Sequence, residues 1–303
     1  MRLRRLSVFI GVCTVTLSIS AWLATAQQAP VAANAPKDWR QSTGPVRMYN
    51  TAKKKLMEGK QIVGGTVSSP DPNIYCAMAG SGFDYMWIEM QHSPLTYSDV
   101  AKMIWACKGP ASPFIRVPDA TESEIQKATD IGALGIIVPT VDTVEKAAAA
   151  VKWAKYPPVG RRSMGSGQFG ALWGSDYRQT INDNMLVAIM IETPLGVANA
   201  KEIASVPGID VIFAASTDLG NFSGTKQGEP SYEAMVTTIH DTVLKAGMKL
   251  GGPLAWKGRP GFTFLQGPGE TALIRLATPV ALGTAPGTKP QSGVAPLEGV
   301  GPH

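Results

Sequence analysis

The sequence is poor in the residues that define several classes of protein. Its 303 residues include only three cysteines and three histidines, and the cysteines show no metal-ligand spacing. Charged residues make up 17% of the chain, and no lysine and arginine cluster is interleaved with aromatic residues, which argues against nucleic-acid binding. Beyond the N-terminus there is no long apolar run, so nothing further along the chain is expected to span a membrane.

The first 26 residues have the pattern of an export signal. Three arginines in residues 1–5 precede an apolar or small-residue run over 6–23, and Ala24-Thr25-Ala26 matches a small-x-small cleavage site before Gln27. Cleavage between Ala26 and Gln27 removes three arginines and no acid, so the formal net charge falls from +5 to +2. The mature protein is then expected to be periplasmic or secreted and away from the membrane. An uncleaved membrane anchor is the alternative.

Two cysteines remain after removal of the signal, which carries Cys13. In an oxidising compartment Cys76 and Cys107 could form one disulfide, but the sequence does not place them side by side. The simpler expectation is that each is a small buried hydrophobic residue on a helix.

Composition divides the rest of the chain into three parts. Residues 27–45 are rich in Ala, Pro and Gln and are predicted to form a linker. Residues 46–285 are predicted to form one domain, and the Gly/Pro-rich tail 286–303 is predicted to be disordered.

Strand and helix patterns alternate through the central domain. Strands are predicted at 61–67, 84–89, 113–117, 135–138, 186–191, 209–215, 249–255 and 279–282. Eight strands alternating with helices over about 240 residues predict an α/β fold, the (β/α)8 or TIM barrel. A doubly wound open sheet is the rival, but the even spacing and the lack of a Gly-x-Gly-x-x-Gly turn after the first strand favour the barrel.

The longest predicted loop, 159–183, is glycine-rich and contains Arg161 and Arg162. Long structured loops are often functional, so this segment is a candidate lid over the substrate.

Titratable residues stand at the ends of four predicted strands. Glu89 and His92 follow the second strand, Arg116 closes the third, Glu192 closes the fifth, and Asp218 lies just past the sixth. In a barrel the carboxyl ends of the strands surround one opening, so these side chains are predicted to converge.

The chemistry of this set is complementary. Glu192 and Asp218 offer the oxygen ligands that suit Mg²⁺, Mn²⁺ or a similar hard ion, and two protein ligands leave positions for substrate and water. Arg116 has the fork geometry that binds a carboxylate, and His92 titrates near neutral pH and can move a proton.

Each residue also has a simpler interpretation. Glu192 could cap the helix that begins near Pro194, and Asp218 could belong to an Asx-turn. Arg116 could pair with Asp119.

At these positions the sequence resembles the HpcH/HpaI aldolase family, the metal-dependent (class II) pyruvate aldolases. The resemblance runs from about residue 50 to 252. It rests on the segments Gly82-Phe83-Asp84 through His92-Ser93-Pro94, Phe114-Ile115-Arg116-Val117-Pro118, Asp130-Ile131-Gly132-Ala133, Ile137-Val138-Pro139-Thr140-Val141-Asp142, Tyr156-Pro157-Pro158-Val159-Gly160-Arg161-Arg162, Ile191-Glu192-Thr193, and Gly208-Ile209-Asp210 through Asp218-Leu219.

The resemblance implies reversible cleavage of a 4-hydroxy-2-oxo acid into pyruvate and an aldehyde through a metal-stabilised enolate. It implies a divalent metal, Mg²⁺ or Mn²⁺ with Co²⁺ also possible. It also implies that the substrate is a small 2-oxo acid and that the chain forms a homo-oligomer. The implied metal ligands are Glu192 and Asp218, and the implied catalytic residues are His92, Arg116 and Glu89, with Glu89 orienting the histidine. Arg116, Ser216 and Thr217 are the implied substrate-binding residues.

The sequence departs from the family pattern near the substrate. Met90-Gln91 replaces Gly-Glu, Met190 replaces a glutamine, and Ala215-Ser216-Thr217 replaces Gly-Pro-Ala. Beyond Trp256 no counterpart is evident of the final helix that subunits of the family exchange. These departures leave two alternatives open: an exported barrel that binds a 2-oxo acid without cleaving it, and a citrate-lyase-like lyase.

Overall fold

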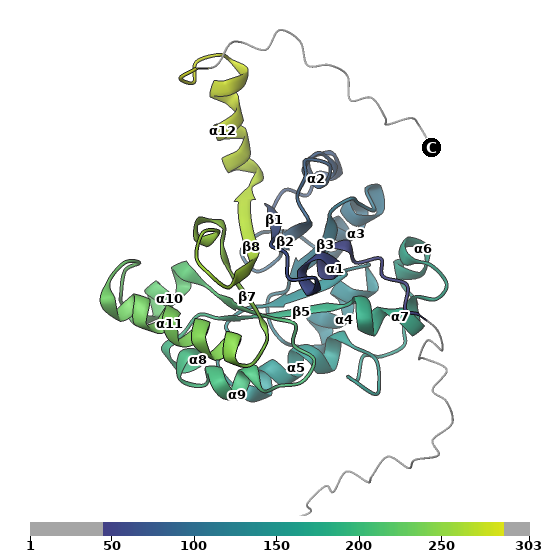
Figure 1. Ribbon diagram of the computed structural model, residues 1–303. Coiled ribbons are helices and arrows are strands. Elements are labelled where there is room, and N and C mark those ends of the chain that lie inside the picture. Colours follow the sequence, from purple (N-terminus) through teal and green to yellow (C-terminus); the bar gives the residue numbers. More distant parts are fainter. Residues whose placement is uncertain (1–44, 288–303) are drawn as a thin grey trace, which may run out of the picture. The chain divides into compact units, whose positions relative to one another are not determined.

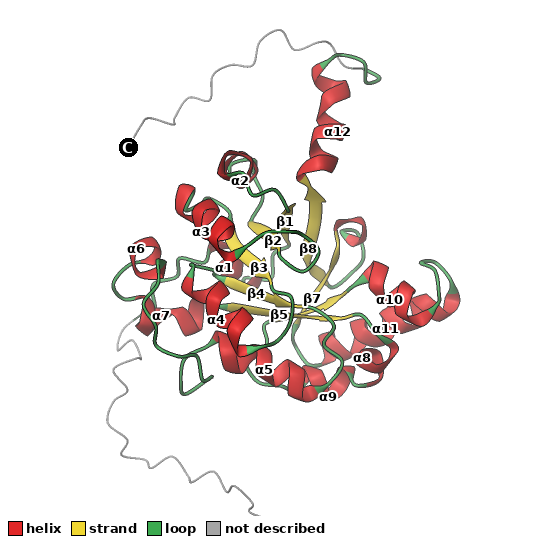
Figure 2. Ribbon diagram, turned by 180° about the vertical axis from the view of Figure 1, so that it is seen from behind, coloured by secondary structure: helices red, strands yellow, loops and turns green. Residues whose placement is uncertain are grey.

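The computed structural model describes residues 45–287 and shows a closed parallel barrel. The strands pair in sequence order and β8 pairs with β1, while the helices lie outside the sheet (Figures 1 and 2). The strands are β1 (Ile62–Val67), β2 (Tyr85–Glu89), β3 (Ser112–Arg116), β4 (Gly135–Val138), β5 (Leu186–Ile191), β6 (Val211–Ala214), β7 (Lys249–Pro253) and β8 (Phe262–Gly269). The predicted (β/α)8 barrel is confirmed.

Four of the helices that follow barrel strands begin at a threonine. The side chains of Thr96, Thr121, Thr143 and Thr193 each accept a hydrogen bond from a first-turn N–H, which satisfies a donor that the helix cannot pair internally. The helices are α1 (Thr51–Met57), α2 (Pro72–Ala79), α3 (Tyr97–Ala106), α4 (Glu122–Asp130), α5 (Val144–Ala154), α6 (Phe169–Trp173), α7 (Tyr177–Asn184), α8 (Pro194–Ala198), α9 (Ala200–Ala204), α10 (Ser216–Ser223), α11 (Pro230–Lys245) and α12 (Glu270–Ala281), with a 3₁₀ turn at Leu254–Trp256. Within residues 45–287, no helix combines the length and apolar character needed to cross a membrane.

Aromatic rings fill the barrel interior opposite glycines. The ring of Tyr85 stacks 4.8 Å from that of Phe114 and 4.7 Å from that of Phe264. A Cβ atom at Gly64 would lie 2.2 Å from the Tyr85 ring, and one at Gly135 would lie 2.5 Å from Phe114. The small residues therefore make room for the large ones, which fill the barrel interior.

The last predicted strand was wrong. Residues 279–282 continue α12 and the turn after it, and the eighth strand is Phe262–Gly269, which pairs with both β1 and β7. A short apolar run does not distinguish strand from helix by its periodicity, and what places β8 is barrel closure between two neighbours.

The helix α12 lies at the end of the described chain, where the sequence predicts a helix around 269–277 but shows no evident counterpart of the family's exchanged helix. No residue of α12 is buried, and Ile274, Leu276 and Leu282 are each at least 60% exposed. The helix continues from β8 away from the barrel (Figure 1).

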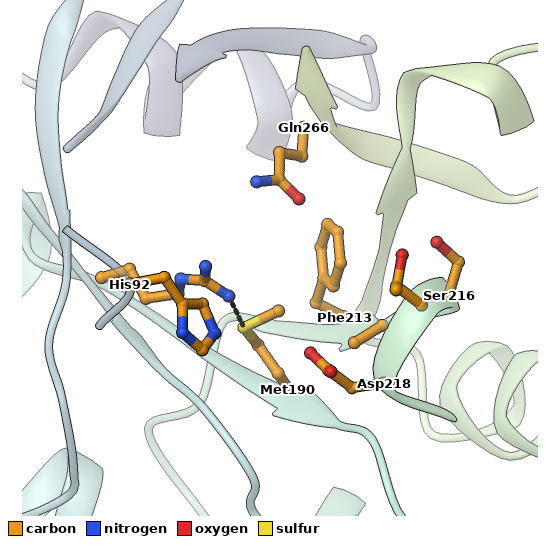
Figure 3. Close-up of a pocket in the computed structure, with 9 residues that line it drawn as sticks. His92, Met190, Phe213, Ser216, Asp218 and Gln266 are labelled. Carbon is orange, nitrogen blue, oxygen red and sulfur yellow. Dashed lines mark hydrogen bonds between the residues drawn. The ribbon is translucent and has the colours of Figure 1, made fainter. Parts of the chain in front are cut away.

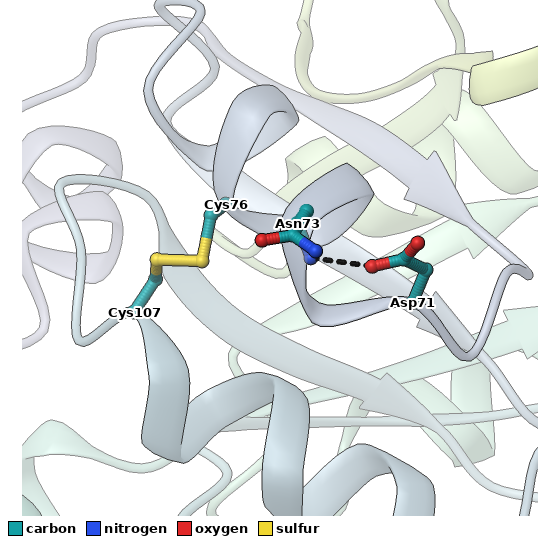
Figure 4. Close-up of a disulfide and its surroundings, with 4 residues drawn as sticks. All are labelled: Asp71, Asn73, Cys76 and Cys107. Atoms are coloured by element: carbon teal, nitrogen blue, oxygen red, sulfur yellow. Dashed lines mark hydrogen bonds between the residues drawn. A yellow bond between two sulfur atoms is a disulfide. The ribbon is translucent and has the colours of Figure 1, made fainter.

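A disulfide joins Cys76 in α2 to Cys107 at the end of α3, with the two Cα atoms 5.6 Å apart (Figure 4). The expectation of two unpaired buried cysteines was wrong. Consecutive helices of the barrel pack side by side, and this packing brings together two residues 31 positions apart.

The segment 159–183 is not a lid over the opening at the carboxyl ends of the strands. It contains α6 and most of α7, and none of its residues lines the cavity at the strand ends. The Arg162 side chain is fully buried, where it donates hydrogen bonds to Asp130 at the end of α4 and to Tyr177, while Arg161 lies 5.7 Å from the ring of Trp153. This segment therefore packs beside the ends of α4 and α5.

The predicted signal peptide, 1–26, lies outside the described residues. So do nearly all of the predicted linker, 27–45, and of the predicted tail, 286–303.

Candidate active site and metal site

A cavity of about 300 Å³ lies at the carboxyl ends of the strands. Residues from or just after β2, β3, β5, β6 and β8 contribute to it, as the barrel topology requires (Figure 3). Its lining consists of His92, Arg116, Met190, Phe213, Ala215, Ser216, Thr217, Asp218 and Gln266. Five of the seven predicted site residues are therefore brought together in one cavity, and the other two, Glu89 and Glu192, contact or lie beside them.

Arg116 and Glu89 form a buried ion pair. Alternation along β2 points Glu89 to the same side as Trp87, while register pairs Glu89 with Arg116 on β3. The Nε and Nη2 atoms of Arg116 lie 2.6 and 2.5 Å from Oε2 of Glu89, and both side chains are less than 10% exposed. The alternative pairing of Arg116 with Asp119 is wrong, since Asp119 pairs with Lys146.

This ion pair determines which part of Arg116 faces the cavity. Glu89 occupies the Nε and Nη2 edge, and Nη1 contacts the Met190 sulfur at 4.0 Å. Sulfur is a weak acceptor, so Nη1 retains donor capacity toward a ligand.

Glu89 also fixes the turn that carries His92. Its Oε1 accepts the main-chain N–H groups of Gln91 and His92 at 2.8 and 3.0 Å, and its Oε2 accepts from the Trp87 indole. Glu89 therefore holds the main chain of the turn and not the imidazole. Within the described residues the His92 ring has no hydrogen-bond partner, and it is exposed at the cavity.

Glu192 is a buried carboxylate with one free oxygen. Its Oε2 accepts hydrogen bonds from the main-chain N–H and the hydroxyl of Thr140, at 2.7 and 2.8 Å. Its Oε1 is buried and has no partner among the described residues. Burial raises the pKa of Glu192, the hydrogen bonds from Thr140 oppose this, and the nearby charge of Asp218 adds to it. Glu192 does not cap α8, because Thr193 does.

Asp218 lies in the first turn of α10, with its carboxylate toward the cavity (Figure 3). It makes no side-chain hydrogen bond within residues 45–287, so the predicted alternative of an Asx-turn has no support. The residue before the helix, Ala215, has no side-chain oxygen, so the first-turn N–H groups at Ser216 and Thr217 lack a side-chain cap.

These two carboxylates fit a hard divalent cation. Glu192 presents a buried oxygen without a partner, and the charge of Asp218 is close enough to raise the pKa of Glu192. Across the described part of the chain no three His, Cys, Asp or Glu residues are grouped to hold a metal ion. Glu192 and Asp218 could therefore supply two of the oxygen ligands that such an ion prefers.

Sequence reasoning missed three residues of this site. Thr140 was noted only as part of a family segment, and Phe213 and Gln266 were not considered. Alternation along β6 and β8 would point Phe213 and Gln266 inward, but β8 had not been located. No local signal marks Thr140, whose role depends on a residue 52 positions away.

Comparison with known proteins agrees with this geometry. The family model described as HpcH/HpaI aldolase/citrate lyase matches residues 67–254, which is more than half of the chain. A 2-dehydro-3,6-dideoxy-6-sulfogluconate aldolase from Pseudomonas putida is 33% identical over 182 residues, covering 58% of this chain and 71% of that protein. A 2-keto-3-deoxy-L-rhamnonate aldolase from Escherichia coli K12 is 31% identical over 210 residues, covering 67% and 79%.

A solved structure shows the same likeness. The HpcH/HpaI aldolase/citrate lyase family protein from Burkholderia cenocepacia superposes with a TM-score of 0.71 at 26% identity, covering 77% of this chain and 98% of that one. Members of this family typically depend on a divalent metal. The chain therefore belongs to the HpcH/HpaI aldolase/citrate lyase family and is a lyase of the class II pyruvate aldolase type.

Proposed function

We propose that this protein cleaves a 4-hydroxy-2-oxo acid, of the 2-keto-3-deoxy acid class, into pyruvate and an aldehyde. The observation that carries the proposal is the convergence of Asp218, Arg116 and an exposed histidine on one cavity at the strand ends, with the buried carboxylate of Glu192 beside it. The names of the two aldolases compared above, both of which act on 2-oxo-3-deoxy acids, support this substrate class.

Glu192 and Asp218 would hold the cation, Mg²⁺ or Mn²⁺ with Co²⁺ also possible. When bound there, a divalent cation supplies positive charge that polarises the 2-oxo carbonyl and favours the enolate form of pyruvate.

The substrate carboxylate would lie between Arg116 and the start of α10. Arg116 offers Nη1, because Glu89 already occupies the other edge of its guanidinium. Ser216 and Thr217 offer hydroxyls and uncapped N–H groups at the positive end of the helix. Glu89 keeps Arg116 in place and so acts as a positioning residue.

His92 would move the proton of the 4-hydroxyl. In cleavage the imidazole accepts that proton, the C3–C4 bond breaks, and its electrons remain on C3 as the enolate while C4 becomes the aldehyde carbonyl. Transfer of that proton from the imidazolium to C3 then gives the pyruvate methyl group and restores the neutral imidazole. The exposed imidazole, which has no partner within the described chain, is free to do this.

Gln266 would bind the far part of the substrate. Its amide reaches into the cavity from β8, on the side away from Asp218 (Figure 3). A hydroxyl beyond C4 would find a donor and an acceptor in the amide of Gln266.

Pyruvate release from a panel of 4-hydroxy-2-oxo acids, measured with EDTA and after addition of Mn²⁺ or Mg²⁺, tests the proposal. Metal-dependent turnover of at least one substrate is the expected result. If no substrate is cleaved while pyruvate still binds and its methyl protons do not exchange, the protein is a 2-oxo-acid-binding barrel. Turnover confined to citrate or a related thioester would make it a citrate-lyase-like enzyme.

We also propose that the protein is exported and assembles with copies of itself. The N-terminal pattern, the cleavage site before Gln27 and the Cys76–Cys107 disulfide support an oxidising periplasmic or extracellular location. The exposed apolar residues of α12 support a homo-oligomer in which this helix is covered. N-terminal sequencing of the protein from a periplasmic fraction and light scattering of the purified protein check the two statements.

A further inference from the structure

Thr140 has a backbone conformation that its side chain disfavours. It follows β4 and has a φ of 49°, and within residues 45–287 it is the one non-glycine residue with positive φ. A β-branched side chain rarely occupies this left-handed region, because Cβ crowds the following carbonyl. Such a conformation persists only where surrounding contacts impose it, and these are concentrated at functional sites.

The contacts that impose it involve Glu192. In this conformation the main-chain N–H and the hydroxyl of Thr140 both donate to the same atom, Oε2 of Glu192. The next residue, Val141, donates its N–H to the carbonyl of Met190 on β5, which ties the turn after β4 to the strand that carries Glu192. Two donors on one oxygen disfavour rotation of the carboxylate, because rotation would break both hydrogen bonds.

The result is an asymmetric carboxylate. Oε2 is fully engaged, and Oε1 is buried without a partner. A carboxylate free to rotate could exchange these two oxygens, whereas one held by Thr140 always offers the same oxygen.

We infer that Thr140 is a positioning residue that presents Oε1 of Glu192 to a divalent cation. This inference rests on the proposed function, because it assigns the Glu192 and Asp218 pair to a metal ion. It adds a residue that does not itself touch the ion, of the kind whose loss typically weakens metal binding about 10-fold to 100-fold.

The variants Thr140→Ser and Thr140→Ala separate the hydroxyl from the rest of the side chain. Both lose the β-branch, and they differ by one hydroxyl group. Calorimetric titration of the full chain with Mn²⁺ alone should give a Kd close to that of the unmodified protein for Thr140→Ser and about 10-fold weaker for Thr140→Ala. Circular dichroism confirms that both variants are folded.

Thr143→Val is the matched control. Thr143 lies three residues further on and uses its hydroxyl to cap α5, at 3.2 Å from the N–H of Lys146. Its variant should melt at a lower temperature and bind Mn²⁺ with unchanged affinity.

Equal Mn²⁺ affinity in the serine and alanine variants would overturn the role of Thr140 while leaving the metal site intact. The same would follow if Thr143→Val weakened binding as much as Thr140→Ala. If the unmodified chain bound no Mn²⁺, or if Glu192→Gln bound it normally, the proposed metal site itself would be wrong, and this inference with it.

Discussion

The two ends of the barrel both contain buried charges, but only one end leaves them unpaired. At the amino ends of the strands, Asp210 lies 3.0 Å from Lys53 and 3.7 Å from Lys155, and it also accepts the N–H of Val187. Lys53 further donates to the carbonyl of Met185. Every charge in this cluster therefore has a partner.

At the carboxyl ends of the strands the pairing of polar groups is incomplete. Oε1 of Glu192 is buried without a partner, and neither Asp218 nor the His92 ring makes a side-chain hydrogen bond within residues 45–287. A buried polar atom without a partner costs stability, and Oε1 of Glu192 is such an atom beside the cavity, whereas the side chains of Asp218 and His92 are accessible to a ligand. The comparison indicates that the amino end stabilises the fold and that the carboxyl end holds the chemistry.

The largest effect on stability is expected at the amino end. Asp210→Asn removes the ion-pair partner of two buried ammonium groups, and breaking a buried ion pair in this way typically costs about 3–5 kcal/mol of unfolding free energy. Chemical denaturation measures the loss, and Asp241→Asn, at a side chain that is 70% exposed, is the control. A loss below about 0.5 kcal/mol would contradict the assignment of this end to stability.

The stability loss in Asp210→Asn should also depend on pH. Burial lowers the pKa of Lys155, and Asp210 opposes this shift, so the shift should increase in the variant. A lysine whose pKa is lower in the folded state than in the unfolded state destabilises the fold while it is charged. Stability therefore rises as the pH increases from the folded-state pKa to the ordinary lysine pKa. Denaturation at neutral pH and at about pH 10 should show a smaller deficit at the higher pH.

At the carboxyl end a similar substitution should have the opposite result. Glu192→Gln removes a proposed metal ligand and is expected to lower kcat/KM about 10²–10³-fold, comparable to the loss of one transition-state-stabilising group. Because burial raises the pKa of Glu192, removing its charge should leave the melting temperature in EDTA unchanged or higher. Glu202→Gln, on the exposed side of α9, is the control. A Glu192→Gln variant that is less stable than the unmodified protein but fully active would contradict the assignment of chemistry to this end of the barrel.

A smaller effect is expected between the two ends, at the disulfide. The Cys76–Cys107 bond closes a segment of 31 residues that contains Glu89 and His92. Replacing both cysteines by alanine should lower the unfolding free energy by about 2–4 kcal/mol. A reductant should destabilise the unmodified protein to the same extent and leave the double variant unchanged. If the reductant has no effect on the unmodified protein, the bond does not form in solution.

The smallest effect concerns substrate choice at the mouth. Gln266→Leu removes a hydrogen-bonding group of the proposed subsite for the far part of the substrate, and a single neutral hydrogen bond corresponds to about a tenfold change. The ratio of kcat/KM for a substrate with a 5-hydroxyl to that for 4-hydroxy-2-oxopentanoate should fall by that factor. An unchanged ratio would place the far end of the substrate elsewhere.

Local sequence patterns were sufficient for most of the barrel and for three of the cavity residues, His92, Arg116 and Asp218, while Ser216 and Thr217 came from the family resemblance. The ends of two apolar runs placed Glu89 and Arg116 at the ends of β2 and β3, and barrel topology then predicted that they converge. The same reasoning failed at β8, because the apolar residues near 280 read equally well as strand or helix.

Local patterns in the chain establish that strands alternate with helices and that acidic, basic and imidazole groups stand at the strand ends. The pairing of Glu89 with Arg116, the Cys76–Cys107 bond and the contact of Thr140 with Glu192 become visible only in the folded barrel. The difference follows from the sequence separation of the residues involved. A strand or a helix cap is encoded by residues a few positions apart, whereas each of these contacts joins different elements, 27 to 52 residues apart, that meet only once the barrel closes.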